Sequence, residues 1–158
     1  MSEKMHLMEA SAQWSTRPDD ERFWTLEEAR DACAGYRATA VEAPQVEYSS
    51  LRTEAREGEV VLVGKKEVPA RLNHWSFGQL SQRVGAPAGY LRGLSPTLAA
   101  QNLNYGLARV GERDGDRTAN ILMHGNGGFL VRAFTSDVYE RVWNDSVLER
   151  LVELQGHG

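Results

Sequence analysis

Residues 51–72 read LRTEAREGEVVLVGKKEVPARL, and this stretch decides the fold class. Polar and apolar residues alternate over residues 51–56, residues 59–63 are mostly β-branched and apolar, and residues 68–72 have the composition of a third strand. Two short segments with glycine separate these runs and have the composition of turns. The stretch therefore predicts a small antiparallel meander.

Helical patterns follow this meander along the chain. Apolar residues from Phe77 to Val84 predict a short helix that Gly85 closes, and Pro87 opens a second short helix. Ser95-Pro96 combines an N-cap residue with proline at the first helical position, which predicts a longer helix over residues 97–110. Two short helices and a longer one are therefore expected between the meander and the next strands.

The segments on either side of this region complete the prediction. Thr25-Leu26-Glu27-Glu28 has the form of a capping box and predicts a helix over residues 25–40, ended by Pro44. Residues 118–124 and 129–134 flank Gly125-Asn126-Gly127-Gly128, which predicts a β-hairpin. Ser136 caps a predicted helix over Val138–Trp143. An apolar terminal helix follows the break at Asn144-Asp145.

The chain is therefore expected to have an α+β fold: a small antiparallel sheet with helices packed on one face, and a second β-hairpin. Residues 1–24 are interpreted as a polar lead-in, and residues 25–158 as a single domain. The 158 residues fit one domain of ordinary globular composition.

Composition also indicates the compartment. The longest apolar run falls well short of the roughly 20 residues that span a bilayer, and the first residues lack a signal-peptide core. Cys33 is the single cysteine and lies on the apolar face of a predicted helix, so it is interpreted as a small core residue. We expect a cytoplasmic protein with no membrane association.

The charge distribution is uneven. The net charge is −4, but there is no Asp or Glu between Glu67 and Glu112. Because local sign decides where a phosphate can approach, this acid-free segment is a candidate phosphate-binding region. Scattered arginines that only solvate several faces are the alternative. The segment holds the arginines Arg71, Arg83, Arg92 and Arg109, with His74, Trp75, Phe77, Tyr90 and Tyr105.

Familiar catalytic motifs are absent from the sequence. The four histidines lack the spacing of metal-ligand pairs, the glycine-rich turn at residues 124–128 lacks the Lys-Ser/Thr of a nucleotide-binding loop, and no Gly-x-Ser-x-Gly occurs. We expect no metal and no cofactor, and a binding protein in preference to an enzyme. An enzyme whose catalytic residues are dispersed along the chain is the least favoured alternative. It would have His74 or His124 beside a carboxylate in a pocket.

Residues 77–91 form the most distinctive local pattern, FGQLSQRVGAPAGYL. A helix, a turn glycine and a second helix are typical of a helix-turn-helix, in which residues 87–92 would enter a major groove. The second helix is short and offers only Tyr90 and Arg92 as long polar contacts. An αα-corner packed on the sheet therefore remains the competing interpretation.

Three sequence blocks together resemble a known family. They are Leu80–Leu91, with Leu-x-x-Arg-Val-Gly-x-Pro-x-x-Tyr-Leu, then Asn102-Leu103-Asn104, and finally Arg132–Tyr139, followed by Asn144–Leu148. The chain resembles the phage/plasmid-like proteins of unknown function found in bacteriophage and mobile-element genomes, over roughly residues 45–155. Members of that family are commonly longer at the C-terminus and have no established activity, so the resemblance implies a mobile-DNA context and a short version or N-terminal part.

These observations lead to two functional hypotheses. The first is an accessory protein that binds nucleic acid without sequence preference, by single-strand binding or annealing, and acts as an oligomer. Arginines on opposite faces of the structure would defeat this hypothesis. The second is a module that binds a host protein or replication factor through acidic residues such as Asp19-Asp20-Glu21 and Glu27-Glu28. The residues expected to contact nucleic acid are Arg71, Trp75, Arg83, Tyr90, Arg92, Arg109 and Arg132.

Overall fold

The computed structural model describes residues 22–112, 118–125 and 128–155. The chain divides into two compact units, one containing Thr39–Arg141 and the other containing the residues on either side of this range. We call the first the sheet unit and the second the helical-pair unit, and describe each by itself. The single domain expected over residues 25–158 remains a prediction.

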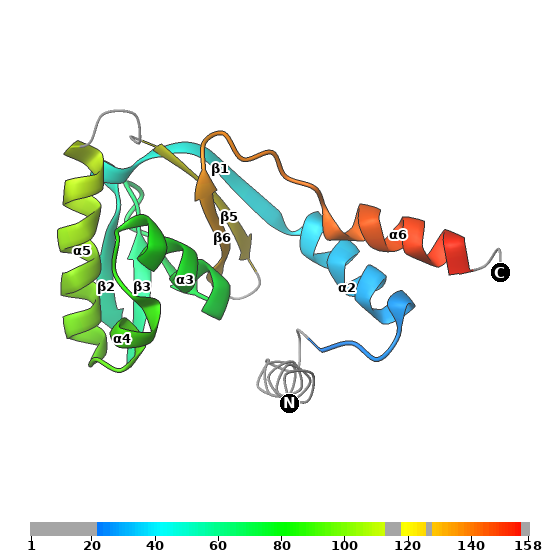
Figure 1. Ribbon diagram of the computed structural model, residues 1–158, viewed down its shortest axis with the longest axis horizontal. Coiled ribbons are helices and arrows are strands. Elements are labelled where there is room, and N and C mark those ends of the chain that lie inside the picture. The colour runs from blue at the N-terminus through cyan, green and yellow to red at the C-terminus, as the bar shows by residue number, and fades with distance from the viewer. Residues whose placement is uncertain (1–21, 113–117, 126–127, 156–158) are drawn as a thin grey trace, which may run out of the picture. The chain divides into compact units, whose positions relative to one another are not determined.

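The sheet unit contains one six-stranded sheet with the order β1-β5-β6-β4-β3-β2 (Figure 1). Neighbouring strands are antiparallel except for the parallel pair β4 and β6. This confirms the α+β fold, and the β4–β6 pair joins the predicted meander and the predicted hairpin into one sheet. The strands are β1 (Ala40–Glu47), β2 (Arg52–Arg56), β3 (Glu59–Val63), β4 (Pro69–Leu72), β5 (Thr118–Gly125) and β6 (Phe129–Ser136).

The first strand was not predicted, because Pro44 was expected to end the preceding helix without a strand beginning before it. β1 tolerates this proline because it is an edge strand with a bulge between Ala43 and Val46. Gln45 takes up the bulge with a φ of 52°, and its N–H donates to Asn120 Oδ1 at 3.0 Å. Because β1 is an edge strand, it has a strand partner on one side only. The Asn120 side chain accepts the hydrogen bond of the Gln45 N–H that the bulge removes from the ladder.

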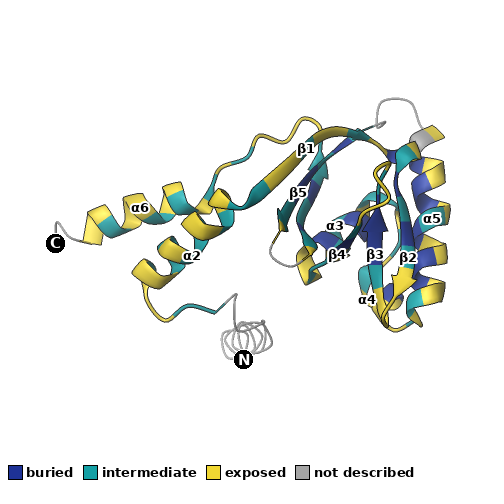
Figure 2. Ribbon diagram, turned by 180° about the vertical axis from the view of Figure 1, so that it is seen from behind, coloured by how far each residue is buried: buried dark blue, intermediate teal, exposed yellow. Residues whose placement is uncertain are grey.

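Three helices cover one face of this sheet (Figures 1 and 2). They are α3 (His74–Arg83), α4 (Ala88–Arg92) and α5 (Pro96–Glu112). Asn73 caps α3 by accepting a hydrogen bond from Ser76 N at 2.8 Å. Between them and the sheet lies the core, whose most deeply buried large side chains are Tyr48, Leu80, Leu91, Leu103, Leu107 and Val131.

An asparagine fixes α5 to the end strand of the sheet. Asn104 Oδ1 accepts from Thr53 N at 2.6 Å, and Asn104 Nδ2 donates to Thr53 O at 2.8 Å. The Thr53 hydroxyl in turn donates to Ala100 O at 2.9 Å. Asn104 therefore supplies the hydrogen bonds that a further strand would make to β2.

The helical-pair unit contains α2 (Leu26–Ala38) packed against α6 (Asn144–Gln155). The predicted cap is present, because Thr25 Oγ1 accepts from Glu28 N at 3.1 Å and Glu28 reaches back to Trp24 N. Arg37 joins the helices through Asp145 at 3.1 Å and lies over the Trp143 ring at 5.2 Å. The helix predicted over Val138–Trp143 is wrong: this segment is a turn and extended chain with Val138 exposed, and α6 begins at Asn144.

Candidate nucleic-acid interface

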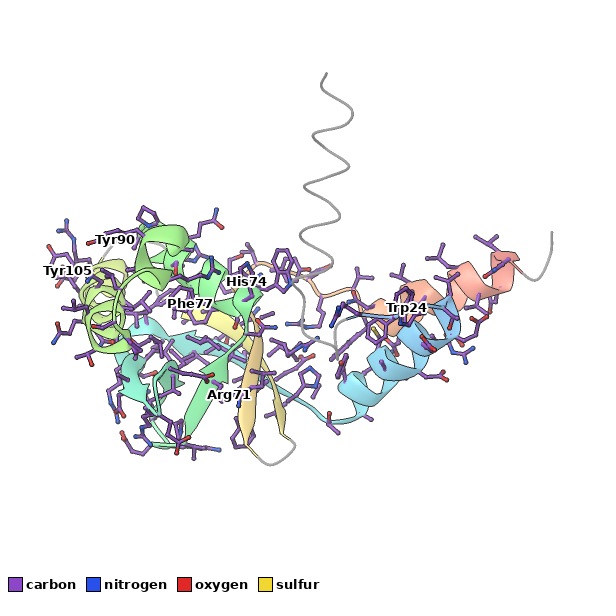
Figure 3. All side chains as sticks on the ribbon, turned by 90° about the horizontal axis from the view of Figure 1, so that it is seen from below. Trp24, Arg71, His74, Phe77, Tyr90 and Tyr105 are labelled. Atoms are coloured by element: carbon purple, nitrogen blue, oxygen red, sulfur yellow. The ribbon has the colours of Figure 1, made fainter. Side chains whose placement is uncertain are left out.

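Arg71 lies on the face of the sheet that α3, α4 and α5 do not cover. Its neighbours in β4, Ala70 and Leu72, pack in the core. Because side chains alternate along a strand, Arg71 points to the opposite face, away from the helices that carry Tyr90 and Tyr105 (Figure 3). We call this face the open sheet face.

Arg132 belongs to the same face. A bulge in β6 places Met123 opposite Val131 but Leu122 opposite Ala133, so Arg132 is the extra residue. His124 pairs with Leu130, which is itself the β-partner of Arg71, so His124 lies on the open sheet face. Burial lowers the pKa of His124, and the positive charges of Arg132 and Arg141 lower it further.

The structure thus divides the five predicted arginines between two faces. Arg71 and Arg132 lie on the open sheet face, whereas Arg83, Arg92 and Arg109 belong to the helices. The single arginine surface expected from the sequence does not form. The five-arginine site is therefore ruled out by the criterion set above, and only a narrower candidate site without Arg71 and Arg132 remains.

Four arginines of the sheet unit, Arg52, Arg56, Arg71 and Arg141, are held by carboxylates. Arg52 bonds to Glu54 at 2.8 Å and also pairs with Glu67, and the carboxylates hold the pKa of Arg52 above its ordinary value. Arg56 shares Glu54 at 2.7 Å. Arg71 also pairs with Glu59 at 3.6 Å, and Arg141 pairs with Glu42 at 3.7 Å. A phosphate approaching the open sheet face must compete with these acids.

Arg92, at the end of α4, is held in a different way. Its Nη2 donates to the backbone oxygen of His74 at 2.9 Å, and its guanidinium lies over the Phe77 ring, 5.2 Å from the centroid. Both partners belong to the first turns of α3, so Arg92 links α4 to α3. A guanidinium has five N–H donors, so most of the Arg92 donors are not used by these two partners.

Arg109 on α5 repeats this arrangement. Its Nη1 donates to the Tyr105 hydroxyl at 2.8 Å, and its guanidinium lies 5.5 Å from the centroid of the same ring. The hydroxyl contact raises the pKa of Arg109 above its ordinary value. The spacing of four residues places both side chains on one face of the helix. An aromatic ring, not a carboxylate, therefore positions this arginine as well.

Exposed aromatic rings accompany these arginines. Tyr90 is 62% exposed, Tyr105 is 67% exposed and Trp75 is 53% exposed (Figure 3 labels the two tyrosines). Trp75 meets His74 edge-on, with 5.7 Å between ring centroids. Rings of this size that stay exposed are candidate stacking platforms for bases.

Arg83 lies half-buried at the end of α3 and lines a hollow of about 560 Å³. Its wall combines amide and hydroxyl groups, including Gln79, Gln82, Ser136 and Tyr139, with the apolar side chains of Val110 and Phe134. The Gln79 side chain is already engaged, because its Oε1 accepts from Phe134 N at 2.8 Å. This hollow adds a cationic, hydrogen-bonding recess to the helical layer.

The helices α3, α4 and α5 thus carry five of the seven predicted residues. We define the helical surface as the side chains of Trp75, Arg83, Tyr90, Arg92, Tyr105 and Arg109 on α3, α4 and α5. The first acid after Glu67 is Glu112, in the last turn of α5. Positive charge and exposed rings therefore occur together on helices that carry almost no negative charge.

Three contributors were not predicted as site residues: His74, Phe77 and Tyr105. Phe77 is half-buried beneath Arg92. The Tyr105–Arg109 pair could have been found from its i, i+4 spacing within the predicted helix. The contact between Arg92 and α3 depends on the α3–α4 turn, which has Gly85 at a φ of 75°.

The α3–α4 segment itself agrees with the αα-corner and not with a helix that enters a groove. α4 spans only five residues, and Leu91 is buried in the core. A recognition helix needs an exposed surface of several turns to reach base edges. Arg92 also contacts α3 in preference to projecting outward.

No family model, curated protein or solved structure matches this chain. Among the described residues, no helix is long and apolar enough to cross a membrane.

Proposed function

We propose that the sheet unit binds unpaired nucleic acid through the helical surface. The observation that carries this proposal is the combination of Arg92 and Arg109, each held on an aromatic ring, with exposed Tyr90, Trp75 and Tyr105. Single-strand-binding proteins use cationic grooves for the backbone and aromatic rings for the bases. The helical surface carries arginines and exposed aromatic rings.

The way the arginines are held supports contact with phosphate. An exposed ion pair must be broken before a phosphate can replace its carboxylate, but a cation over a ring keeps its charge and most of its donors. Arg92 and Arg109 lack ion pairs within the described part of the chain, whereas Arg52, Arg56 and Arg71 have them. The helical surface is thus better suited to phosphate than the open sheet face.

A salt series measured by fluorescence anisotropy with labelled single-stranded oligonucleotides tests this proposal. Each arginine that neutralises a phosphate contributes about 0.7 to the slope of log K against log salt concentration for single strands. Arg92→Gln and Arg109→Gln should each reduce the slope by about this amount. Arg56→Gln is the matched control, because it removes the same charge from the open sheet face and should leave the slope unchanged. No binding by the wild type at low salt would refute the proposal.

A second candidate function is protein binding by the helical-pair unit. Exposed Val147, Leu151 and Leu154 recur on one face of α6, beside Glu149 and Glu153. An exposed apolar face rimmed by acids is typical of a protein contact surface. Sedimentation analysis over a range of concentrations tests self-association: Leu151→Lys should abolish it if α6 contacts a second copy, and wild-type protein that stays monomeric would exclude that partner.

A further inference from the structure

The hollow at Arg83 lies where β6 continues beyond the end of β4. The parallel pairing of these strands ends at Leu72 and Val131, so in the described sheet the last residues of β6 have no strand on that side. The end of α3, the end of α5 and the turn after β6 line the space that remains, about 560 Å³. This volume lies within the range of about 300–1,000 Å³ typical of small-ligand sites.

A side chain of α3 takes the place of the missing strand at one point. Gln79 Oε1 accepts from Phe134 N at 2.8 Å, and this bond fixes which end of the amide faces β6. The oxygen of Gln79 is thereby used. Its Nε2 group, with two N–H donors, is what Gln79 can offer to a ligand in the hollow that it lines. The hollow therefore has an amide of fixed polarity that supplies donors.

The other polar groups of the hollow also supply donors. Arg83 follows Gln79 by four residues, so the guanidinium and the amide share one face of α3. Ser136 follows Phe134 by two residues in β6, which places its side chain on the same face of the sheet. Tyr139 is positioned by a turn, in which its N–H donates to Ser136 O at 3.2 Å. Among the described residues, no Asp or Glu lines this hollow, so it suits a negatively charged group rich in acceptors.

Apolar and aromatic surface adjoins these donors. Val110 and Phe134 line the hollow and are buried, whereas the Tyr139 side chain that also lines it is 52% exposed. Bases stack on exposed aromatic side chains, and an apolar wall favours a flat ring removed from water. The hollow thus offers a surface for a planar ring next to donors for an anion.

We infer that this hollow binds a nucleoside that carries a phosphomonoester. The phosphate oxygens accept from Arg83, Gln79 and Ser136, in charge-assisted hydrogen bonds that are shorter and stronger than neutral ones. The base lies against Tyr139. A free nucleotide and the phosphorylated end of a strand share this chemistry. The inference goes beyond the proposed function, because a free nucleotide can occupy the hollow whether or not the rest of the helical surface binds a strand.

Isothermal titration calorimetry with deoxyadenosine monophosphate and with deoxyadenosine tests the site. Wild-type protein should bind the nucleotide about tenfold more tightly than the nucleoside, because the nucleoside lacks the charged acceptor. Gln79→Glu should remove this preference, since the new carboxylate can still accept from Phe134 N but brings negative charge in place of donors. Arg83→Gln should weaken nucleotide binding about tenfold and leave nucleoside binding unchanged. Gln101→Glu is the matched control: it adds the same charge at an exposed position of α5 outside the hollow and should preserve the preference.

A second comparison separates the two sources of the phosphate. Fluorescence anisotropy compares a labelled oligonucleotide that carries a phosphate at one end with the same oligonucleotide without it. Tighter binding of the phosphorylated strand, removed by Gln79→Glu, identifies a strand end as the occupant. Preference for the phosphate in calorimetry alone identifies the free nucleotide. No preference for the phosphate in either assay would overturn the inference, whereas failure of the wild type to bind any strand would refute the proposed function and not the nucleotide site.

Discussion

The helical layer and the open sheet face of the same unit use arginine in opposite ways. On the open sheet face, Arg52, Arg56 and Arg71 are neutralised by carboxylates, whereas Arg92 and Arg109 in the helical layer rest on Phe77 and Tyr105. Exposed ion pairs contribute about 0–1 kcal/mol to stability and satisfy the charge locally. A ring positions the guanidinium without neutralising it. The partner of an arginine, more than its presence, thus indicates whether it is available to a phosphate.

The two regions also differ in what holds them in place. Packing positions the helical layer, whereas carboxylates hold Arg52, Arg56 and Arg71 on the open sheet face. Substitutions that disturb packing should therefore cost far more stability than those that alter charge.

The largest effect is expected at Gly106, where α5 approaches α3. A Cβ atom here would lie 2.4 Å from Val84 Cβ and 3.1 Å from Val84 O, too close for either helix to remain in position. Gly106→Ala should lower the free energy of unfolding by about 3 kcal/mol, measured by urea denaturation. Gly89→Ala is the control, since a Cβ there has no neighbour within 4 Å and helix propensity favours alanine. A loss below about 1 kcal/mol for Gly106→Ala would contradict close packing of α5.

A smaller effect is expected where the helical layer meets β2. Asn104→Ala removes both hydrogen bonds to the Thr53 backbone and leaves a partly buried N–H without an acceptor. The expected loss of unfolding free energy is about 2 kcal/mol. Asn102→Ala provides the comparison: its amide bonds only to Leu98 O on the exposed side of α5, and the change should be within about 0.5 kcal/mol. Similar losses for both variants would show that Asn104 does not secure the strand.

The smallest effect concerns His124 on the open sheet face. The pKa of His124 is lowered in the folded protein, first by burial and then by Arg132 and Arg141, whereas an unfolded histidine has a pKa of about 6.5. The unfolded chain therefore binds more protons below about pH 6.5, so stability falls as the pH is lowered from there towards the folded pKa. His124→Gln should make this decline shallower in urea denaturation above pH 5, where Glu54 and Glu67 stay ionised because their pKa values are lowered from 4.5. An unchanged decline would exclude His124 as its source.

The elements that could be predicted from the sequence are those specified by local signals. Alternation and turn glycines located β2 and β3, and the Ser95-Pro96 start located α5. The strand β1 was missed because proline usually ends a regular element, and only its edge position and bulge make Pro44 acceptable. The false helix at Val138–Trp143 had an N-cap signal, but Val138 and Val142 find no buried surface there.

Only part of the candidate site could be predicted, and the reason differs from the one that applies to the missed strand and the false helix. The residues of the helical surface all lie in the acid-free segment, which is visible in the composition along the chain. Which face Arg71 and Arg132 occupy depends on strand register, and a single bulged residue at Arg132 changes it. The partners of each arginine come from distant segments, as with Arg92 and His74, so sequence distance does not reveal them.

The most direct test of the account is ultraviolet cross-linking of the protein to oligonucleotides that contain iododeoxyuridine, with the modified residues located by mass spectrometry. Base stacking brings the photoreactive ring against aromatic side chains. The account predicts cross-links at Tyr90, Tyr105 and Trp75, which Arg92→Gln combined with Arg109→Gln should reduce. Cross-links confined to β2, β3 and the helical-pair unit would contradict it.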